Sequence, residues 1–500
     1  MTSDLGDLPE EEFRRLLHEA ADWVADYRAG IGSRRVAPAG RPGEVSAALP
    51  REPPRVPEPM DDILRDFERV VMPGILHWGH PAFLGYFSTT TTAPGILGEM
   101  LAAALNVSAM TWQTSPAATE LETVVLDWMR QMLGLPEGFR GVVYDTASVA
   151  LLHALAAARE ESGRDVRRAG LAGRGDVPVL TLYASDQAHS SVEKSAIVLG
   201  VGEENVRRVE TDGEYRMKVE ALREALDEDA RAGRRPLAVV ATVGTTSATS
   251  VDPVEEIADA CRERGVWLHV DAAYGGALAL LEEGRWVMRG VERADSVVFN
   301  PHKWLYVPLD FSALYVRRPE TLRRVFSLVP EYLRGDAERA GEAMPNYMDY
   351  GIQLGRRFRA LKAWFVIRAF GRDGLAARIR EARRLALLFA SWVESDPRFE
   401  LLAPVHMAVV CFRARLTRGA ETGPPGADAT DADALNERLL ERVNDTGSAY
   451  LTHTRLHTRL ALRVAVGNVL TTETHLARAW ELIRLQLESI LSEERPASRA

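Results

Sequence analysis

Short apolar runs and helical stretches alternate through the middle of the chain. The runs are rich in β-branched and aromatic residues, and each stops at small or polar residues, as buried strands do. They cover residues 142–144, 179–183, 237–243, 266–270 and 297–299. Because strands and helices alternate from residue 142 to residue 316, the pattern predicts an α/β fold, with a mainly parallel sheet and helices on both faces.

The two ends of the chain follow other patterns. Residues 9–29 place apolar side chains at helical spacing, whereas the Pro-, Gly- and Arg-rich residues 36–59 cannot build a core of their own. The N-terminal part is therefore expected to lie across another surface, although composition alone equally allows a plain linker. We predict an N-terminal helical and extended segment (residues 1–85), a large domain (86–379) and a small C-terminal α/β domain (380–500).

Composition and charge exclude several classes of protein. The 500 residues are 46% hydrophobic and 26% charged, which is ordinary for a globular protein. A net charge of −10 with scattered arginines argues against nucleic acid as a partner. The start of the sequence lacks a basic, apolar leader, and no apolar run is long enough to cross a membrane. We therefore expect a cytoplasmic protein without membrane spans.

The sequence gives no sign of a metal site or a disulfide. Cys261 and Cys411 lie far apart without CxxC spacing, which favours buried free thiols. His453 and His457 have the spacing of a helical zinc pair, but the residues around them alternate as in strands. We therefore predict no metal.

Lys303 follows the buried run of residues 297–299, which stops at Asn300 and Pro301. The lysine is therefore expected at a strand end, where open α/β sheets place their chemistry. Beside Trp304 it would be partly desolvated, which lowers the pKa of the amine and leaves more of it free to attack a carbonyl. A lone lysine in such a position is more often an ordinary surface residue.

Asp271 argues against the interpretation of Lys303 as an ordinary surface lysine. It follows the strand-like residues 266–270 and precedes small residues, so a flat ligand could approach it closely. A carboxylate beside a pyridine nitrogen keeps that nitrogen protonated, and the protonated ring then draws electrons from groups bonded to it. Alone, Asp271 would more often be a helix cap. With Lys303 at the end of the next strand, the pair fits pyridoxal 5′-phosphate (PLP).

A hydroxyl-bearing turn at residues 146–148 lies between a strand and a helix. Free backbone N–H groups at the start of a helix bind anions well, so Thr146, Ala147 and Ser148 are candidates to hold a phosphate. Simple capping of the helix by these hydroxyl groups is the alternative, and the sequence does not separate the two.

Four motifs together resemble the group II PLP-dependent decarboxylases, especially the aromatic-L-amino-acid decarboxylases. They are residues 300–304 (Asn-Pro-His-Lys-Trp), 269–274 (His-Val-Asp-Ala-Ala-Tyr), 183–191 (Tyr-Ala-Ser-Asp-Gln-Ala-His-Ser-Ser) and 354–358 (Leu-Gly-Arg-Arg-Phe). The resemblance runs in register from about residue 80 to residue 482. It implies the type I PLP-dependent fold, which is also called aspartate-aminotransferase-like.

The resemblance implies the roles of the cofactor-binding residues. Lys303 would attach PLP covalently, Asp271 would pair with the ring nitrogen, and His189 would stack on the ring and help to position the substrate. Without the resemblance, His189 would be interpreted as a core histidine. The other implied cofactor contacts are Thr146, Ala147, Ser148 and Asn300 at the phosphate end, together with His302 and with Thr246, which could otherwise be part of a threonine-rich turn.

Two further roles and a partner also follow from the resemblance. Thr89 would contact the substrate. Tyr332, in the irregular segment 326–346, would hand a proton to the substrate carbon, with His189 as the alternative donor. The family's N-terminal helices wrap the other protomer, which implies a homodimer.

We therefore predict PLP-dependent decarboxylation of an L-amino acid, with an aromatic substrate favoured by the overall similarity. A non-aromatic substrate such as glutamate stays open, because the resemblance weakens around Ser108, Met110 and Trp112. An aldehyde synthase of the same family would also deaminate its substrate oxidatively, although the two candidate proton donors argue against it. A non-enzymatic binding protein would have no reason to keep the paired lysine and aspartate.

Overall fold

The computed structural model describes residues 6–87, 90–328, 344–416 and 427–493. Its contacts divide the chain into two units. Unit 1 consists of Met1–Leu84, Arg438–Leu451 and Leu470–Ala500, and unit 2 consists of Gly85–Glu437 and Thr452–Val469. The domain boundaries expected from the sequence, at residues 85 and 379, stay predictions.

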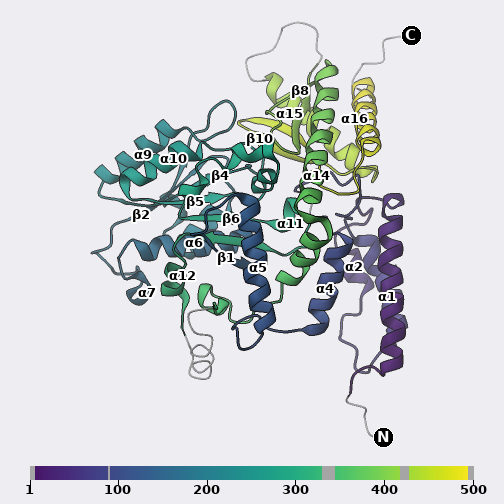
Figure 1. Ribbon diagram of the computed structural model, residues 1–500. Coiled ribbons are helices and arrows are strands. Elements are labelled where there is room, and N and C mark those ends of the chain that lie inside the picture. The colour runs from purple at the N-terminus through teal and green to yellow at the C-terminus, as the bar shows by residue number, and fades with distance from the viewer. Residues whose placement is uncertain (1–5, 88–89, 329–343, 417–426, 494–500) are drawn as a thin grey trace. The chain divides into compact units, whose positions relative to one another are not determined.

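Unit 2 is built on a seven-stranded sheet with the order β1-β7-β6-β5-β4-β2-β3 (Figure 1). Strands β3, β2, β4, β5 and β6 run parallel, whereas β7 is antiparallel to both β6 and β1. The mainly parallel sheet predicted from the apolar runs is therefore confirmed. The strands are β1 (Arg140–Tyr144), β2 (Leu180–Ser185), β3 (Val206–Val209), β4 (Arg235–Thr242), β5 (Trp267–Asp271), β6 (Ser296–Phe299) and β7 (Ser312–Val316).

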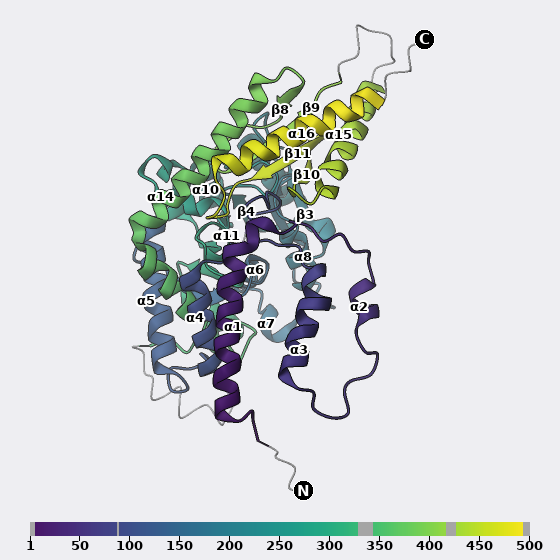
Figure 2. The same ribbon diagram turned by 90° about the vertical axis from the view of Figure 1, so that its right-hand side faces the viewer.

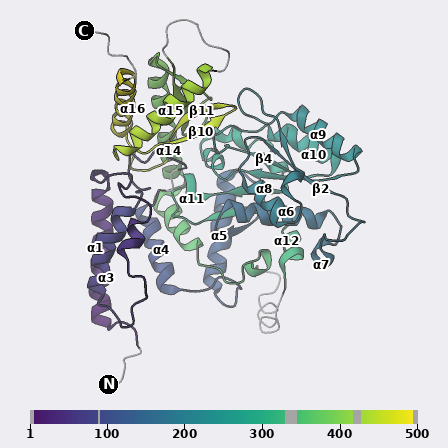
Figure 3. The same ribbon diagram turned by 180° about the vertical axis from the view of Figure 1, so that it is seen from behind.

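Helices cover both faces of this sheet, which explains why every residue of β2, β6 and β7 is buried. In Figures 1 and 3, α9 and α10 lie on one side of the sheet, and α6 and α12 lie on the other. The helices of this part are α4 (Ala93–Leu105), α5 (Pro116–Leu133), α6 (Ala147–Glu161), α7 (Val166–Ala169), α8 (Ser191–Val198), α9 (Val219–Arg231), α10 (Val254–Arg264), α11 (Pro301–Trp304) and α12 (Pro319–Phe326), with short turns η4 (Glu203–Asn205), η5 (Gly275–Leu280), η6 (Glu282–Met288), η7 (Val291–Arg293) and η9 (Tyr347–Tyr350).

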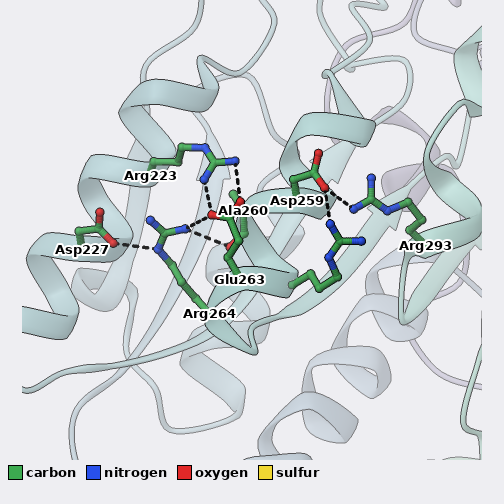
Figure 4. A network of polar contacts seen from close by, with 8 residues as sticks. Arg223, Asp227, Asp259, Ala260, Glu263, Arg264 and Arg293 are labelled. Atoms are coloured by element: carbon green, nitrogen blue, oxygen red, sulfur yellow. Dashed lines mark hydrogen bonds and ion pairs between the residues drawn. The ribbon is translucent and has the colours of Figure 1, made fainter.

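A network of ion pairs joins the outer surfaces of α9 and α10 (Figure 4). Arg264 Nε lies 2.8 Å from Asp227 Oδ1, and Arg223 of α9 pairs with Glu263 of α10. Arg293 of η7 pairs in the same way with α10. Because these side chains are partly exposed, water and salt screen the pairs, and we expect the network to contribute little to the stability of the fold.

A second, antiparallel sheet in unit 2 has the order β10-β11-β9-β8. Its strands are β8 (Phe399–Leu401), β9 (Val409–Ala414), β10 (Thr452–Leu456) and β11 (Arg459–Ala465). The long helix α14 (Ala360–Ser395), which is broken at Gly371 (φ +64°), contacts α4 and α5 as well as β8 and β9. The helix therefore packs both on the antiparallel sheet and on two helices of the larger part of the unit. Helix α15 (Ala427–Asp445) follows β9 and continues into unit 1.

Unit 1 gathers helices from both ends of the chain. Arg15 of α1 pairs with Asp61 of α3 at 3.0 Å, and the ring of Phe83 stacks on that of Tyr450 with centroids 5.5 Å apart. Figure 2 draws the N-terminal helices of this unit in purple and its C-terminal helix in yellow. The helices of this unit are α1 (Glu10–Gly30), α2 (Glu44–Ala48), α3 (Met60–Asp66) and α16 (Glu473–Glu493), with short turns η1 (Ile31–Ser33), η2 (Phe67–Val71) and η3 (Met72–Gly74).

Neither a membrane span nor a metal cluster is found in the described part of the chain. Within residues 6–87, 90–328, 344–416 and 427–493, no helix is both long and apolar enough to cross a membrane. In the same ranges, no group of three or more His, Cys, Asp and Glu side chains is placed to hold a metal ion.

Candidate active site

A cavity of about 180 Å³ opens at the carboxyl ends of β4, β5 and β6. It gathers nine of the residues singled out in the sequence, although these residues come from five separate segments. They are Thr146, Ala147, Ser148, His189, Thr246, Asp271, Asn300, His302 and Lys303. Five further lining residues were not expected from the sequence, namely Phe87, Thr242, Gly244, Ala273 and Tyr274.

Lys303 lies in the short helix α11, which begins directly after β6. Asn300 precedes the helix, and its carbonyl accepts a hydrogen bond from the Lys303 backbone N–H at 2.9 Å. The Nζ atom lies 5.1 Å from the centre of the Phe87 ring. Burial lowers the pKa of Lys303 below its ordinary value; Asp271 opposes this shift and Arg463 adds to it. The amine is thus held in a state that favours attack on a carbonyl.

Asp271 is the last residue of β5. One carboxylate oxygen, Oδ1, accepts a hydrogen bond from the Ala273 backbone N–H at 3.0 Å, which fixes the carboxylate at the edge of the cavity. The turn opposite carries Gly244 at φ +91°, where a Cβ atom would come within 3.0 Å of the Gly275 backbone nitrogen. Glycine is required there because the two turns approach each other closely.

His189 lies on the loop before α8. Its Nδ1 atom accepts a hydrogen bond from the Ser191 backbone N–H at 3.1 Å and lies 2.9 Å from Ser191 Oγ. Because Nδ1 acts as an acceptor, the neutral ring carries its proton on Nε2. Burial lowers the pKa of His189, and the nearby Lys303 adds to that effect. The site therefore holds a flat, neutral imidazole.

The start of α6 forms another part of the cavity wall. Thr146 precedes the helix, but its side chain caps none of the helix N–H groups; its backbone N–H instead donates to Asp145 Oδ1 at 2.6 Å. The N–H groups of the first turn therefore remain available to an anion. Thr146 therefore does not cap the helix, as the alternative interpretation of this turn would require.

Asn300 and His302 are oriented by their neighbours. Asn300 Oδ1 accepts a hydrogen bond from Ser312 Oγ at 2.7 Å, so the amide Nδ2 group is left to donate elsewhere. His302 Nδ1 accepts a hydrogen bond from the Phe311 backbone N–H at 3.0 Å, and burial lowers the pKa of His302 to about 4. Both residues thus offer N–H donors without adding charge.

Three stacked aromatic rings form a wall that the sequence reasoning missed. The centroids of Phe87 and Tyr274 are 3.9 Å apart, and those of Tyr274 and Trp304 are 4.9 Å apart. The Arg463 guanidinium lies over Phe87 with its carbon 4.8 Å from the ring centre. Tyr274 and Trp304 lie in the motifs at residues 269–274 and 300–304, whereas Phe87 lies in none of the four motifs, and only the fold brings the three rings together.

Two candidate residues cannot be located. Thr89 and Tyr332 lie outside the described residues, so their substrate and proton-transfer roles stay predictions.

The residues of the cavity fit PLP. A lowered-pKa amine suits its carbonyl, Asp271 suits its ring nitrogen, and the free N–H groups at the start of α6 suit its phosphate. The buried Thr242 Oγ1 atom lacks a hydrogen-bond partner among the described residues. Such an unpaired hydroxyl is expected where a polar ligand completes the site.

Comparisons with known proteins agree with this fit. Residues 42–415 match the model of the pyridoxal-dependent decarboxylase conserved domain. The chain is 41% identical to aromatic-L-amino-acid decarboxylase of Rattus norvegicus, over 98% of this chain and 100% of the relative. The structure of Oryza sativa TDC with PLP and tryptamine aligns with a TM-score of 0.92 at 39% identity, covering 97% of this chain and 99% of that one. The structure of Catharanthus roseus tryptophan decarboxylase in complex with L-tryptophan aligns with a TM-score of 0.88 at 35% identity, covering 97% of this chain and 100% of that one.

Proposed function

Because the chain belongs to the pyridoxal-dependent decarboxylase family and is a PLP-dependent amino-acid decarboxylase, we propose that its substrate is an aromatic L-amino acid, which it converts to the amine and CO2. The observation that carries the chemistry is the meeting of Lys303 and Asp271 at neighbouring strand ends in one cavity. A binding protein without catalysis has no use for a lowered-pKa amine facing a carboxylate.

Each residue of the cavity has a separate task in this proposal. When bound, PLP supplies an electron sink for the bond that loses CO2. When PLP is bound, Lys303 would attach it through the free amine, and Asp271 would accept a hydrogen bond from its ring nitrogen. The imidazole of His189 would cover the ring, and its Nε2–H group would be free to orient the substrate carboxylate. The N–H groups at the start of α6 and the amide of Asn300 would hold the phosphate.

Two kinds of support favour an aromatic substrate. The rat relative and the two plant proteins are named for, or bound to, aromatic amino acids or their amines. Phe87 and Tyr274 line the cavity, and their stacking on each other and on the buried Trp304 holds flat apolar surface next to Lys303.

A pooled assay tests the substrate class. The purified protein is incubated with PLP and a mixture of the twenty amino acids together with hydroxylated aromatic ones, and mass spectrometry identifies the amines formed. Aromatic amines without equivalent peroxide and ammonia are expected. The amine of glutamate as the main product would overturn the aromatic assignment, and stoichiometric peroxide and ammonia would indicate an aldehyde synthase.

Tyr332 is proposed as the donor of the proton that replaces CO2. General acid catalysis contributes about 10²–10⁴-fold, so Tyr332→Phe is expected to lower kcat by that factor while PLP affinity stays unchanged. Steady-state kinetics and PLP titration measure the two quantities. Tyr350→Phe, which changes a half-buried tyrosine in the segment that follows, is the control and should retain activity. Normal turnover by Tyr332→Phe would remove this role from the mechanism.

A homodimer is proposed as the assembly. Helix α4 exposes Leu97, Met100, Leu101 and Leu105, which share one helical face, and α1 exposes Phe13. Such apolar faces on separate helices are typical of surfaces covered by another subunit. A cytoplasmic location stays a prediction.

A further inference from the structure

Thr242, the last residue of β4, has an unusual environment. Its side chain lines the cavity and is only 4% exposed, and its Oγ1 atom has no hydrogen-bond partner among the described residues. Burying a hydroxyl without a partner is unfavourable, so such groups usually serve a ligand or a neighbour that completes them. None of the motifs in the sequence points to this residue.

The backbone of Thr242 is held firmly. Its N–H donates to the buried carboxylate of Asp252 at 2.8 Å, and the other carboxylate oxygen of Asp252 accepts the Met217 backbone N–H at 2.7 Å. Asp252 is 2% exposed, so water does not compete for these bonds. The remaining freedom of Thr242 is the rotation of its side chain about χ1, which directs the hydroxyl.

Strand register brings Thr242 next to Asp271. The two residues are partners in the parallel pairing of β4 with β5, and both side chains line the same cavity. Neighbouring strands are about 4.8 Å apart, so paired side chains on one face lie within reach of each other. One oxygen of Asp271 accepts the Ala273 N–H, whereas Oδ2 has no hydrogen bond among the described residues.

We propose that Thr242 is a positioning residue for Asp271, donating its hydroxyl proton to the Asp271 carboxylate when the cofactor's ring nitrogen is held there. This inference rests on the proposed role of Asp271. An ionised carboxylate only accepts hydrogen bonds, so the Ala273 N–H, the Thr242 O–H and the protonated ring nitrogen are compatible partners. Together the donors keep Asp271 ionised and oriented toward the ring.

Cofactor affinity of the apo-protein is the first test. Titration with PLP, followed by absorbance, is expected to show about tenfold weaker binding for Thr242→Val, since a hydrogen bond to a charged group is lost. Thr242→Ser keeps the hydroxyl and should bind PLP nearly as the parent protein does. Thr249→Val is the matched control, because Thr249 is also buried with an unpaired Oγ1 but does not line the cavity.

The pH profile of PLP affinity separates this role from a merely structural one. If the hydroxyl favours the ionised carboxylate, the acidic side of the profile moves to higher pH in Thr242→Val. His189, Lys303 and His269 also interact electrostatically with Asp271. They are present in both proteins, so the difference between the two pH profiles reports on the hydroxyl group alone. A uniform loss of affinity at every pH would overturn the proposal.

A double-mutant cycle provides the second test. In an Asp271→Asn background, Thr242→Val is expected to cost little further affinity. An equal loss in both backgrounds would mean that Thr242 contacts the cofactor directly, which overturns the proposal. Unchanged binding by Thr242→Val alone would do the same. Failure of the parent protein to bind PLP would instead contradict the proposed function.

Discussion

Replacing Lys303 by alanine is expected to lower kcat/KM by about 10³-fold or more, as removal of a covalent nucleophile does in other enzymes. The reason is that no other described amine lines the cavity, so nothing replaces the covalent attachment of the cofactor. Borohydride reduction followed by digestion measures the attachment. In the parent protein the pyridoxyl label should lie on the peptide that contains residues 300–304, and in Lys303→Ala it should be absent.

Lys362 is an internal control for this experiment. It is also buried, and burial lowers its pKa, but it pairs with Glu99 at 2.9 Å and does not line the cavity. If desolvation alone made a lysine reactive, Lys362 would be labelled as well. A label on Lys362, or on any peptide other than that of residue 303, would contradict the assignment of the site.

The sequence predicted the strand-end residues of the site for a physical reason. Apolar runs show where buried strands stop, and the chemistry of a parallel sheet collects at the carboxyl ends of its strands. Lys303 and Asp271 both follow such runs, so their meeting in one cavity could be expected. The position of residues 146–148 between a strand and a helix could be expected in the same way, because a hydroxyl-bearing turn before a helix is a local feature; their phosphate-binding role stays a prediction.

Other parts depend on contacts that local patterns do not encode. Thr242 reaches Asp271 only through the register of β4 with β5, and register is decided by packing across the whole sheet. The grouping of both chain ends in unit 1 depends on distant bonds, such as that from the Val36 N–H to the Gly447 carbonyl. The antiparallel direction of β7 was likewise invisible, because a fully buried strand shows the same apolar run in either direction.

The motif at residues 354–358 is fixed against α5 and β1 by a buried ion pair. Arg356 and Glu122 are both nearly inaccessible to water, with Arg356 Nη2 lying 2.6 Å from Glu122 Oε1 and Nη1 lying 3.1 Å from Oε2. Arg356 also donates to the Val143 carbonyl, and Glu122 accepts the Val143 N–H. The pair thus provides hydrogen-bond partners for the backbone N–H and carbonyl groups of Val143 in β1, just before the turn at residues 146–148.

Arg356→Met is therefore expected to lower the free energy of unfolding by about 3–5 kcal/mol, because it leaves the Glu122 carboxylate buried without a counter-charge. In the parent protein burial disfavours the charged form of Arg356, but the interaction with Glu122 outweighs burial and raises the pKa of the arginine, so Arg356 keeps its positive charge. Urea unfolding measures the loss. Adding Glu122→Gln removes the uncompensated charge and should recover part of it.

An exposed pair serves as the comparison for this stability prediction. Arg380 and Glu283 are 2.8 Å apart, but both side chains are about half exposed to water, so Arg380→Met should leave the free energy of unfolding almost unchanged. Because Val143 leads into the turn at residues 146–148, Arg356→Met should also weaken PLP binding, whereas Arg380→Met should not. Equal free energies of unfolding for the two variants would mean that burial does not decide how much the ion pair contributes to stability. Unchanged PLP affinity in Arg356→Met would mean that β1 does not position the proposed phosphate-binding turn.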